Sequence, residues 1–140
     1  HGWQPGYLDD ELIKFLEEVK KLNSRTSLFI DSDPKSVDYA AKLGFDRVEI
    51  YTGPFAHLLE ENKLDLFKQT KKNIIECIAK ARDLGLGVNA GHDLNLENLP
   101  HLKQCGIIDE VSIGHAIMTD ALKFGFTDTI MKYIKVIRNN

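Results

Sequence analysis

Residues 86–92 have the sequence LGVNAGH, and residues 110–115 have the related sequence EVSIGH. Each is a short, mainly apolar run that ends in glycine and histidine, as a buried strand followed by a tight turn does. Two further runs of this kind are RVEIYTG (47–53) and SLFID (27–31), which end in glycine and in a carboxylate. The carboxyl ends of parallel strands meet at one edge of a sheet, and ligands bind there. The four runs therefore predict a functional edge.

Helical patterns lie between these strands. Asp33, Pro34 and Gly44 suit the N-cap, the first turn and the end of one such helix. We expect helices over about 8–23, 34–44, 56–84, 95–104, 117–123 and 127–138. Within the long stretch, the residues expected to be buried are Leu66, Ile74, Ile75, Ile78 and Ala79.

The spacing of the strands favours a parallel sheet. Strand starts near 27, 47, 87 and 110 leave room for helical crossovers, and no Asn-Gly hairpin joins them. Two architectures compete: an open, doubly wound domain, and a (β/α)8 TIM barrel, which needs about 250 residues. Two features favour the barrel. The chain begins with a helix rather than a strand, and a half barrel on its own would leave two open sheet edges. We therefore expect residues 1–140 to supply its C-terminal half, the last four βα units.

Composition narrows the class of protein. The net charge of −3 and the scattered Lys and Arg residues argue against a nucleic-acid partner. No apolar run approaches the roughly 18–20 residues that span a bilayer, and the N-terminus does not resemble a signal peptide. We expect a cytoplasmic protein with no membrane partner. Cys77 and Cys105 have no ligand-like spacing, so we expect them to be buried thiols.

Two glycine-histidine pairs suggest a phosphate site. In barrels of this class, the loops after the last two strands and a short extra helix commonly bind phosphate. Here those strands end in Gly91-His92 and Gly114-His115, and the expected helix 117–123 follows the second pair. Glycine lets the backbone approach an anion, and the helix dipole favours negative charge. The alternative is that the glycines only permit tight turns and that the histidines are hydrogen-bonded packing residues.

Glu49 is an unusual strand residue. Strand alternation places it with Arg47 and Tyr51 on one face of the sheet. A carboxylate inside a barrel is costly unless it is paired or has a chemical task. Glu49 could form a structural ion pair with Arg47, or it could act as a general base or stabilise a developing positive charge.

Neither a metal nor a cofactor is expected. His92 and His115 could be imagined as a zinc pair, but no strand-end carboxylate completes a recognisable ligand spacing. The glycines of 85–91 precede a strand rather than follow one, so they do not form a dinucleotide fingerprint.

Four motifs together resemble the second half of the pyridoxine 5′-phosphate synthase family. In order along the chain they are SLFIDSDP (27–34), VEIYTGPFA (48–56), LGLGVNAGHDLNLENL (84–99) and EVSIGHAIM (110–118), and the resemblance extends from about residue 8 to the C-terminus. It implies a (β/α)8 barrel that condenses 3-amino-2-oxopropyl phosphate with 1-deoxy-D-xylulose 5-phosphate. The products are pyridoxine 5′-phosphate, phosphate and water, so the enzyme would be of the transferase type and act in vitamin B6 biosynthesis. We also expect a homo-oligomer.

The resemblance also implies roles for individual residues. His92 would be a proton donor, Glu49 would stabilise a transition state, and Gly114 and His115 would hold the aminoketone phosphate. Asp93 would join the phosphate site, but the family usually has glycine there, and a carboxylate near a phosphate is unfavourable unless it points away.

The resemblance leaves part of the active site outside this chain. The family's proton acceptors and the residues for its second substrate lie in the first half of the barrel, so we do not expect residues 1–140 to be active alone. Another phosphate-sugar isomerase or aldolase, and a non-catalytic half-barrel that binds phosphate, remain as alternatives.

Overall fold

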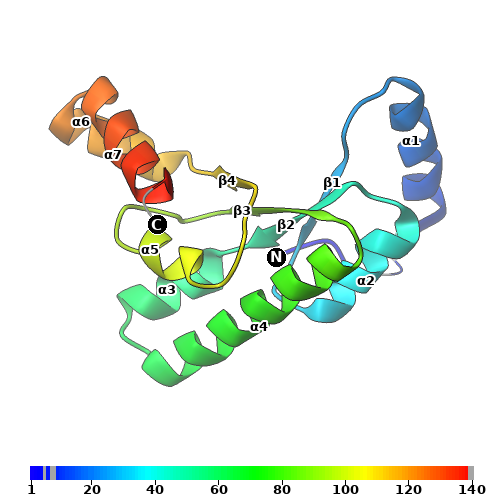
Figure 1. Ribbon diagram of the computed structural model, residues 1–140, viewed down its shortest axis with the longest axis horizontal. Coiled ribbons are helices and arrows are strands. Elements are labelled where there is room, and N and C mark those ends of the chain that lie inside the picture. Colours follow the sequence, from blue (N-terminus) through cyan, green and yellow to red (C-terminus); the bar gives the residue numbers. More distant parts are fainter. Residues whose placement is uncertain (5, 7–8, 139–140) are drawn as a thin grey trace.

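The computed structural model of the protein describes residues 1–4, 6 and 9–138. Its helices and strands, in chain order, are α1 (Asp9–Lys21), β1 (Ser27–Ile30), α2 (Pro34–Leu43), β2 (Arg47–Tyr51), α3 (Gly53–Glu60), α4 (Leu64–Asp83), β3 (Gly87–Gly91), α5 (Leu99–Lys103), β4 (Glu110–Ser112), α6 (His115–Phe124) and α7 (Phe126–Arg138). Figure 1 shows α1 at one end of the molecule and α6 with α7 at the other.

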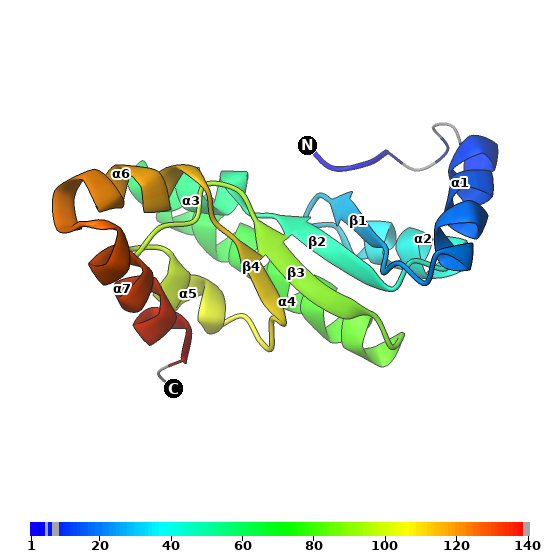
Figure 2. The same ribbon diagram turned by 90° about the horizontal axis from the view of Figure 1, so that it is seen from above.

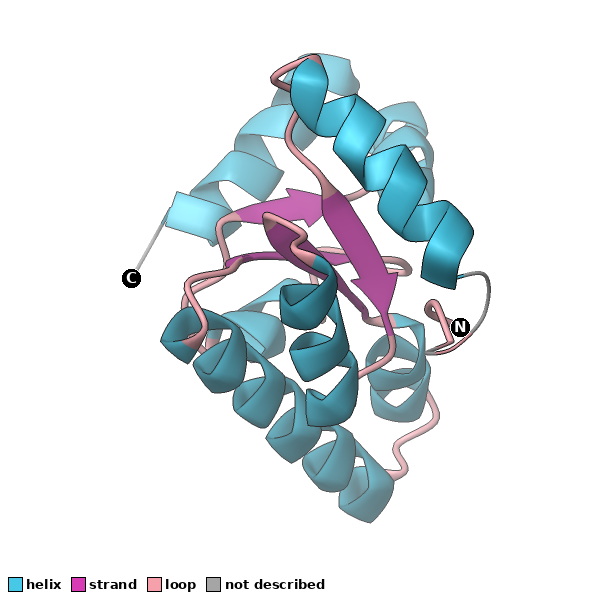
Figure 3. Cartoon of the chain, turned by 90° about the vertical axis from the view of Figure 1, so that its right-hand side faces the viewer, coloured by secondary structure: helices cyan, strands magenta, loops and turns pink. Residues whose placement is uncertain are grey.

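The four strands form one parallel sheet in the order β1-β2-β3-β4. Figure 3 shows the strands side by side with helices outside them. Spatial order follows chain order, whereas an open doubly wound sheet reverses its order at a switch point. The predicted α/β fold with a parallel sheet is confirmed. The order of the described strands has no such reversal, so it does not support the doubly wound alternative.

Alternation along β2 separates the two faces of the sheet. Val48 and Ile50 are fully buried. Arg47, Glu49 and Tyr51 are only partly buried, and they lie on the opposite face. The register aligns Glu49 with Phe29 of β1 on this second face. Charged and polar side chains are thus placed along the face that a barrel would enclose.

The core lies between the first face of the sheet and its helices. Helix α2 begins as predicted: Asp33 accepts a hydrogen bond from the Lys35 N–H at 3.0 Å, Pro34 is its first residue, and Gly44 ends it with φ +82°. Figure 2 shows α2, α3 and α4 along one side of the strands. The largest fully buried apolar side chains are Phe55, Ile30, Ile50, Ile74, Leu94, Leu99, Leu102, Val37, Val48 and Val88.

The single helix expected over 56–84 is wrong. The structure has two helices, because the chain turns at Asn62, which has φ +56°. Helix α3 also starts earlier than expected, since Pro54 suits a first turn. Of the five residues expected to be buried in this stretch, Ile74 and Ile78 are buried, whereas Leu66, Ile75 and Ala79 are exposed.

The other helices begin and end within a few residues of their predicted positions. The helix expected to start at Asn95 starts at Leu99, because Asn95 instead caps a turn by accepting from the N–H groups of Glu97 and Asn98 at 2.9 Å each. Helix α6 begins two residues before the expected 117–123 helix. Residue 8, which starts the first expected helix, lies outside the described residues, as do 139 and 140. In the described part of the chain, no helix has the length and apolar character needed to cross a membrane.

Candidate active site

The carboxyl ends of β2, β3 and β4 surround a cleft of about 740 Å³. All five residues singled out in the sequence line it: Glu49, His92, Asp93, Gly114 and His115. They come from three different strand ends, and the parallel sheet brings them together as expected. The other residues that line the cleft are Glu60, Leu94, Asn95, Ser112, Ile113 and Ala116.

The Glu49 carboxylate reaches across to β3. A Cβ atom built on Gly91 would stand 2.6 Å from Glu49 Oε1, so the carboxylate lies directly over this glycine. Among the described residues, Glu49 has no hydrogen-bond or ion-pair partner. The proposed structural pair with Arg47 is wrong, because Arg47 forms its ion pairs with Asp109 and Glu110. Glu49 is therefore free to interact with a ligand in the cleft.

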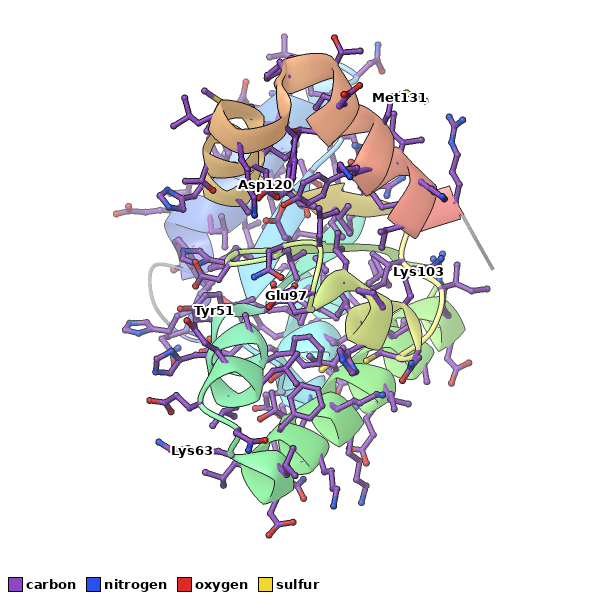
Figure 4. The ribbon with its side chains drawn as sticks, turned by 90° about the vertical axis from the view of Figure 1, so that its left-hand side faces the viewer. Tyr51, Lys63, Glu97, Lys103, Asp120 and Met131 are labelled. Atoms are coloured by element: carbon purple, nitrogen blue, oxygen red, sulfur yellow. The ribbon has the colours of Figure 1, made fainter. Side chains whose placement is uncertain are left out.

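His92 immediately follows β3 in an uncommon backbone conformation. Its φ is +92° and that of Asp93 is +56°, a region that non-glycine residues seldom occupy. The His92 ring meets the Tyr51 ring edge-on, with centroids 4.9 Å apart, and its Nδ1 lies 2.9 Å from Asp93 Oδ2. Figure 4 labels Tyr51, which lies above α3. The imidazole thus has a defined place at the mouth of the cleft.

Two buried side chains hold the backbone at His92 and Asp93. The Thr52 hydroxyl, fully buried, lies 2.7 Å from the Gly91 carbonyl oxygen and 2.6 Å from that of His92. The Asn98 amide donates to the Asp93 carbonyl at 2.9 Å. The Thr52 side chain thus fixes the turn that carries His92.

Gly114 and His115 form the other side of the cleft. Gly114 is the N-cap of α6, no side chain caps this helix end, and nothing stands within 4 Å of a Cβ built on Gly114. The first α-helical bond joins the Met118 N–H to the Gly114 carbonyl oxygen. The N–H groups before it point out of the helix end, as an anion-binding site requires.

One residue predicted at this edge follows its strand there but lies outside the cleft. Asp31 follows β1, but its carboxylate accepts a hydrogen bond from the Gly2 N–H at 2.8 Å and does not line the cleft. Glu60, which no sequence motif singled out, also lines the cleft from the end of α3. Glu60 reaches the cleft because α3 ends there, a break that a single helix over 56–84 would lack.

Two further features of the structure are its cysteine thiols and its possible metal ligands. Cys77 and Cys105 are buried and free, as predicted, and burial raises the pKa of Cys77 to about 12 and that of Cys105 to about 11. Both are therefore unreactive at neutral pH. Among the residues that the structure describes, no group of three or more His, Cys, Asp or Glu side chains could hold a metal ion.

Comparison with known proteins gives a consistent result. The chain is 43% identical over 138 residues to pyridoxine 5′-phosphate synthase of Cytophaga hutchinsonii, covering 98% of this chain and 56% of the relative. The enzymes of the same name from Porphyromonas gingivalis and Bacteroides thetaiotaomicron are each 41% identical, and the match covers 94% and 98% of this chain and 54% and 56% of those relatives.

The chain thus spans about half the length of the curated relatives that it matches. The family described as pyridoxal phosphate biosynthesis protein PdxJ matches residues 1–139, which is nearly the whole chain. With this match and the relatives above, the chain belongs to the PdxJ family.

Proposed function

We propose that this chain is part of a pyridoxine 5′-phosphate synthase. The enzyme would condense 3-amino-2-oxopropyl phosphate with 1-deoxy-D-xylulose 5-phosphate to give pyridoxine 5′-phosphate, phosphate and water. The observation that carries the proposal is the single cleft onto which Glu49, His92, Asp93, Gly114 and His115 converge. Its volume of about 740 Å³ is of the size that small-molecule sites have.

The proposal includes the architecture. Residues 1–140 would be the last four βα units of a (β/α)8 barrel, and a preceding half would supply the first four. Two observations support this: the strand order follows chain order without reversal, and the relatives are about twice as long as the match. Among the described strands, β1 pairs only with β2, and β4 only with β3, so both outer strands are available to a first half.

His92 would act as the proton donor. Imine formation, loss of phosphate, ring closure and dehydration each move protons, so the reaction needs groups that exchange them near neutral pH. The His92 side chain is 55% exposed at the cleft, while its backbone is held from beneath. The side chain thus reaches the cleft while its backbone is fixed, as a proton donor requires.

Glu49 would stabilise positive charge as it develops on the substrate nitrogen. The carboxylate has no cation or donor of its own among the described residues, and it is held over Gly91 inside the cleft. A fixed charge of this kind acts without reorganisation at the moment of reaction.

Gly114 and His115 would bind the phosphate of the aminoketone through their N–H groups at the start of α6. The open space over Gly114 lets an anion approach the backbone. Asp93 would contribute its N–H, with its carboxylate directed to His92 Nδ1 at 2.9 Å rather than to the phosphate.

We include in the proposal that the enzyme is of the transferase type, works in the cytoplasm and is a homo-oligomer. Exposed apolar residues on α6 and α7 are available for contacts with the first half of the barrel or with another subunit; they are Met118, Leu122, Phe126 and Met131. Analytical ultracentrifugation of the full-length protein would give the number of subunits.

The direct test is product formation. The full-length protein, with these residues joined to the first half of the barrel, should form pyridoxine 5′-phosphate only when both substrates are present. Mass spectrometry identifies the product. A different product from one phosphosugar would indicate an isomerase or aldolase, and phosphate binding without turnover would indicate a scaffold.

The His92→Asn variant tests the proton donor in the same assay. Asparagine has a similar volume but cannot carry the proton, so turnover should fall by roughly 10²–10⁴-fold while thermal unfolding changes little. A packing role predicts the reverse: a lower melting temperature, with near-normal turnover per folded molecule.

A further inference from the structure

Buried side chains fix the backbone around His92. Two buried side chains hydrogen-bond to it and a third packs in the core beside it: these residues are Thr52, Asn98 and Leu94, which are 0%, 3% and 2% exposed. The Thr52 hydroxyl donates to the carbonyl oxygens of Gly91 and His92. The Asn98 amide donates to the Asp93 carbonyl oxygen, and the Leu94 side chain lies in the core. The positive φ angles of His92 and Asp93 are therefore imposed by their surroundings.

This backbone brings two adjacent side chains together. Neighbouring residues on a regular strand point to opposite faces of the sheet, so they do not normally meet. Here the His92 Nδ1 and Asp93 Oδ2 atoms lie 2.9 Å apart. In the described part of the chain, Nδ1 of His92 has this carboxylate as its hydrogen-bond partner, and Nε2 has none.

The Tyr51 ring limits the imidazole on a second side. The two rings meet edge-on at 4.9 Å. Tyr51 is itself held: a Cβ atom built on Gly53 would stand 2.5 Å from its ring, and the Phe29 ring lies 5.5 Å away. The imidazole is therefore confined both in position, by a ring, and in rotation, by a hydrogen bond.

We propose that Asp93 is a positioning residue for His92. Its carboxylate accepts a hydrogen bond from the protonated Nδ1, which fixes the ring orientation and leaves Nε2 as the nitrogen that exchanges a proton with the substrate. Which ring nitrogen reacts is set by the hydrogen bond that the other one makes. This rests on the proposed function, in which His92 is the proton donor. It also gives a role to the carboxylate that stands where the resemblance leads one to expect glycine.

Kinetics of the full-length protein test the positioning role. Asp93→Gly removes the acceptor, so kcat should fall roughly 10–100-fold, the size of effect that a misplaced catalytic group produces. KM for the aminoketone phosphate should stay unchanged or fall, since a negative charge leaves the cleft in which the phosphate binds. Asp93→Asn keeps an acceptor oxygen and should retain most of kcat. An unchanged kcat in Asp93→Gly, or an equal loss in both variants, would overturn the proposal.

A matched control separates positioning from backbone relief. Glycine at 93 also relaxes a positive φ of +56°, and Asn23, at φ +53°, offers the same change far from the cleft. Asn23→Gly should leave kcat and KM as in the wild type. A kcat loss in Asn23→Gly of the size seen in Asp93→Gly would assign the effect to backbone change and overturn the role of the carboxylate.

A spectroscopic readout is independent of turnover. With ¹⁵N-labelled histidine, and His92→Asn used to assign the signal, neutral His92 should carry its proton on Nδ1 in the wild type. In Asp93→Gly the proton should move toward Nε2, and in Asp93→Asn it should stay on Nδ1. A wild-type signal from the Nε2–H form would refute the positioning role whether or not the protein makes pyridoxine 5′-phosphate.

Discussion

The Glu49 carboxylate lies over the backbone of Gly91 on the neighbouring strand, where a Cβ atom at position 91 would come within 2.6 Å of Oε1. The register places Gly91 beside Tyr51, two residues beyond Glu49, so the carboxylate leans toward the carboxyl end of the sheet. The absence of a side chain at 91 gives it this space. Gly91 is thus needed for the position of an acidic group and not for an unusual φ angle.

The Gly91→Ala variant should therefore impair chemistry more than folding. The new methyl group would displace the flexible end of Glu49 and would also approach Ser112 Cβ, 3.1 Å away. We expect turnover of the full-length protein to fall by roughly 10²–10³-fold, as when one stabilising group is lost from an active site. The melting temperature should change by only a few degrees. Steady-state kinetics and thermal unfolding of the same preparation measure both.

A double-mutant cycle isolates the contact. In a Glu49→Ala background the carboxylate is already gone, so adding Gly91→Ala should cost little further activity. Additive losses would mean that Gly91 acts through something other than Glu49.

The sequence was sufficient for the strands and for the residues at their ends. Alternation in 47–51 and the glycine-histidine pairs are local patterns, and parallel topology then brings their ends together. The turn at Asn62 left a weaker signal, because asparagine is tolerated both inside a helix and at the positive φ that it adopts here.

The support of the site could not be predicted in the same way. The Thr52 hydroxyl bonds carbonyl groups that are 39 and 40 residues further along the chain, and no local pattern encodes such a contact. The contact between His92 and Asp93 depends on two positive φ angles at non-glycine residues, which tertiary structure imposes. The sequence predicted which residues line the cleft, and the structure adds the contacts that hold them there.

The Thr52→Val variant tests that support. Valine has a similar shape but no hydroxyl, so the His92 carbonyl loses its donor, while the Gly91 carbonyl keeps the Thr52 N–H at 2.9 Å. We expect a loss of about 1–3 kcal/mol in the free energy of unfolding, the cost of a buried polar group without a partner. Turnover should also fall, since the turn that carries His92 is loosened.

Thr52→Ser is the matched control, because it keeps the hydroxyl and removes only a methyl group. Denaturant titration and turnover should place it nearer the wild type than Thr52→Val. Equal behaviour of the two variants would show that packing of the methyl group, rather than the hydroxyl, matters at this position.

A phosphate ion should bind at the start of α6. Crystals of the full-length protein soaked in inorganic phosphate should show it near the N–H groups of Gly114 and His115. Gly114→Ala is compatible with φ −109° but puts a methyl group where the anion approaches the backbone. Calorimetry should then show Kd for phosphate raised roughly 10-fold, or about 1.4 kcal/mol.

Thr119→Ala is the control for this measurement, since its hydroxyl donates, among the described residues, to carbonyl groups within α6. It should leave Kd unchanged. Phosphate density found only away from the ends of β3 and β4 would exclude this helix end as the phosphate site.

Two carboxylates just before the amino ends of β2 and β4 make stability depend on pH. The Thr26 N–H and hydroxyl both donate to Asp46 Oδ2 at 2.7 Å, and the N–H bond is the larger cause of its lowered pKa. For Asp109, burial raises the pKa, but hydrogen bonds from Arg82 and from the Val88 N–H outweigh it, so the net shift is downward. The folded protein therefore stabilises the ionised form of both side chains.

A lowered pKa in the folded state contributes stability above the unfolded value and loses it as pH falls through the folded value. An unfolded aspartate titrates near pH 3.9, so the melting temperature should hold steady above about pH 5 and drop progressively below about pH 4. Asp46→Asn should lower the melting temperature at pH 7 and approach the wild type in acid, because neither protein then has a carboxylate there. Glu17→Gln, an exposed change in α1, should follow the wild-type curve throughout. A constant difference between Asp46→Asn and the wild type from pH 7 to pH 2 would assign the effect to shape rather than charge.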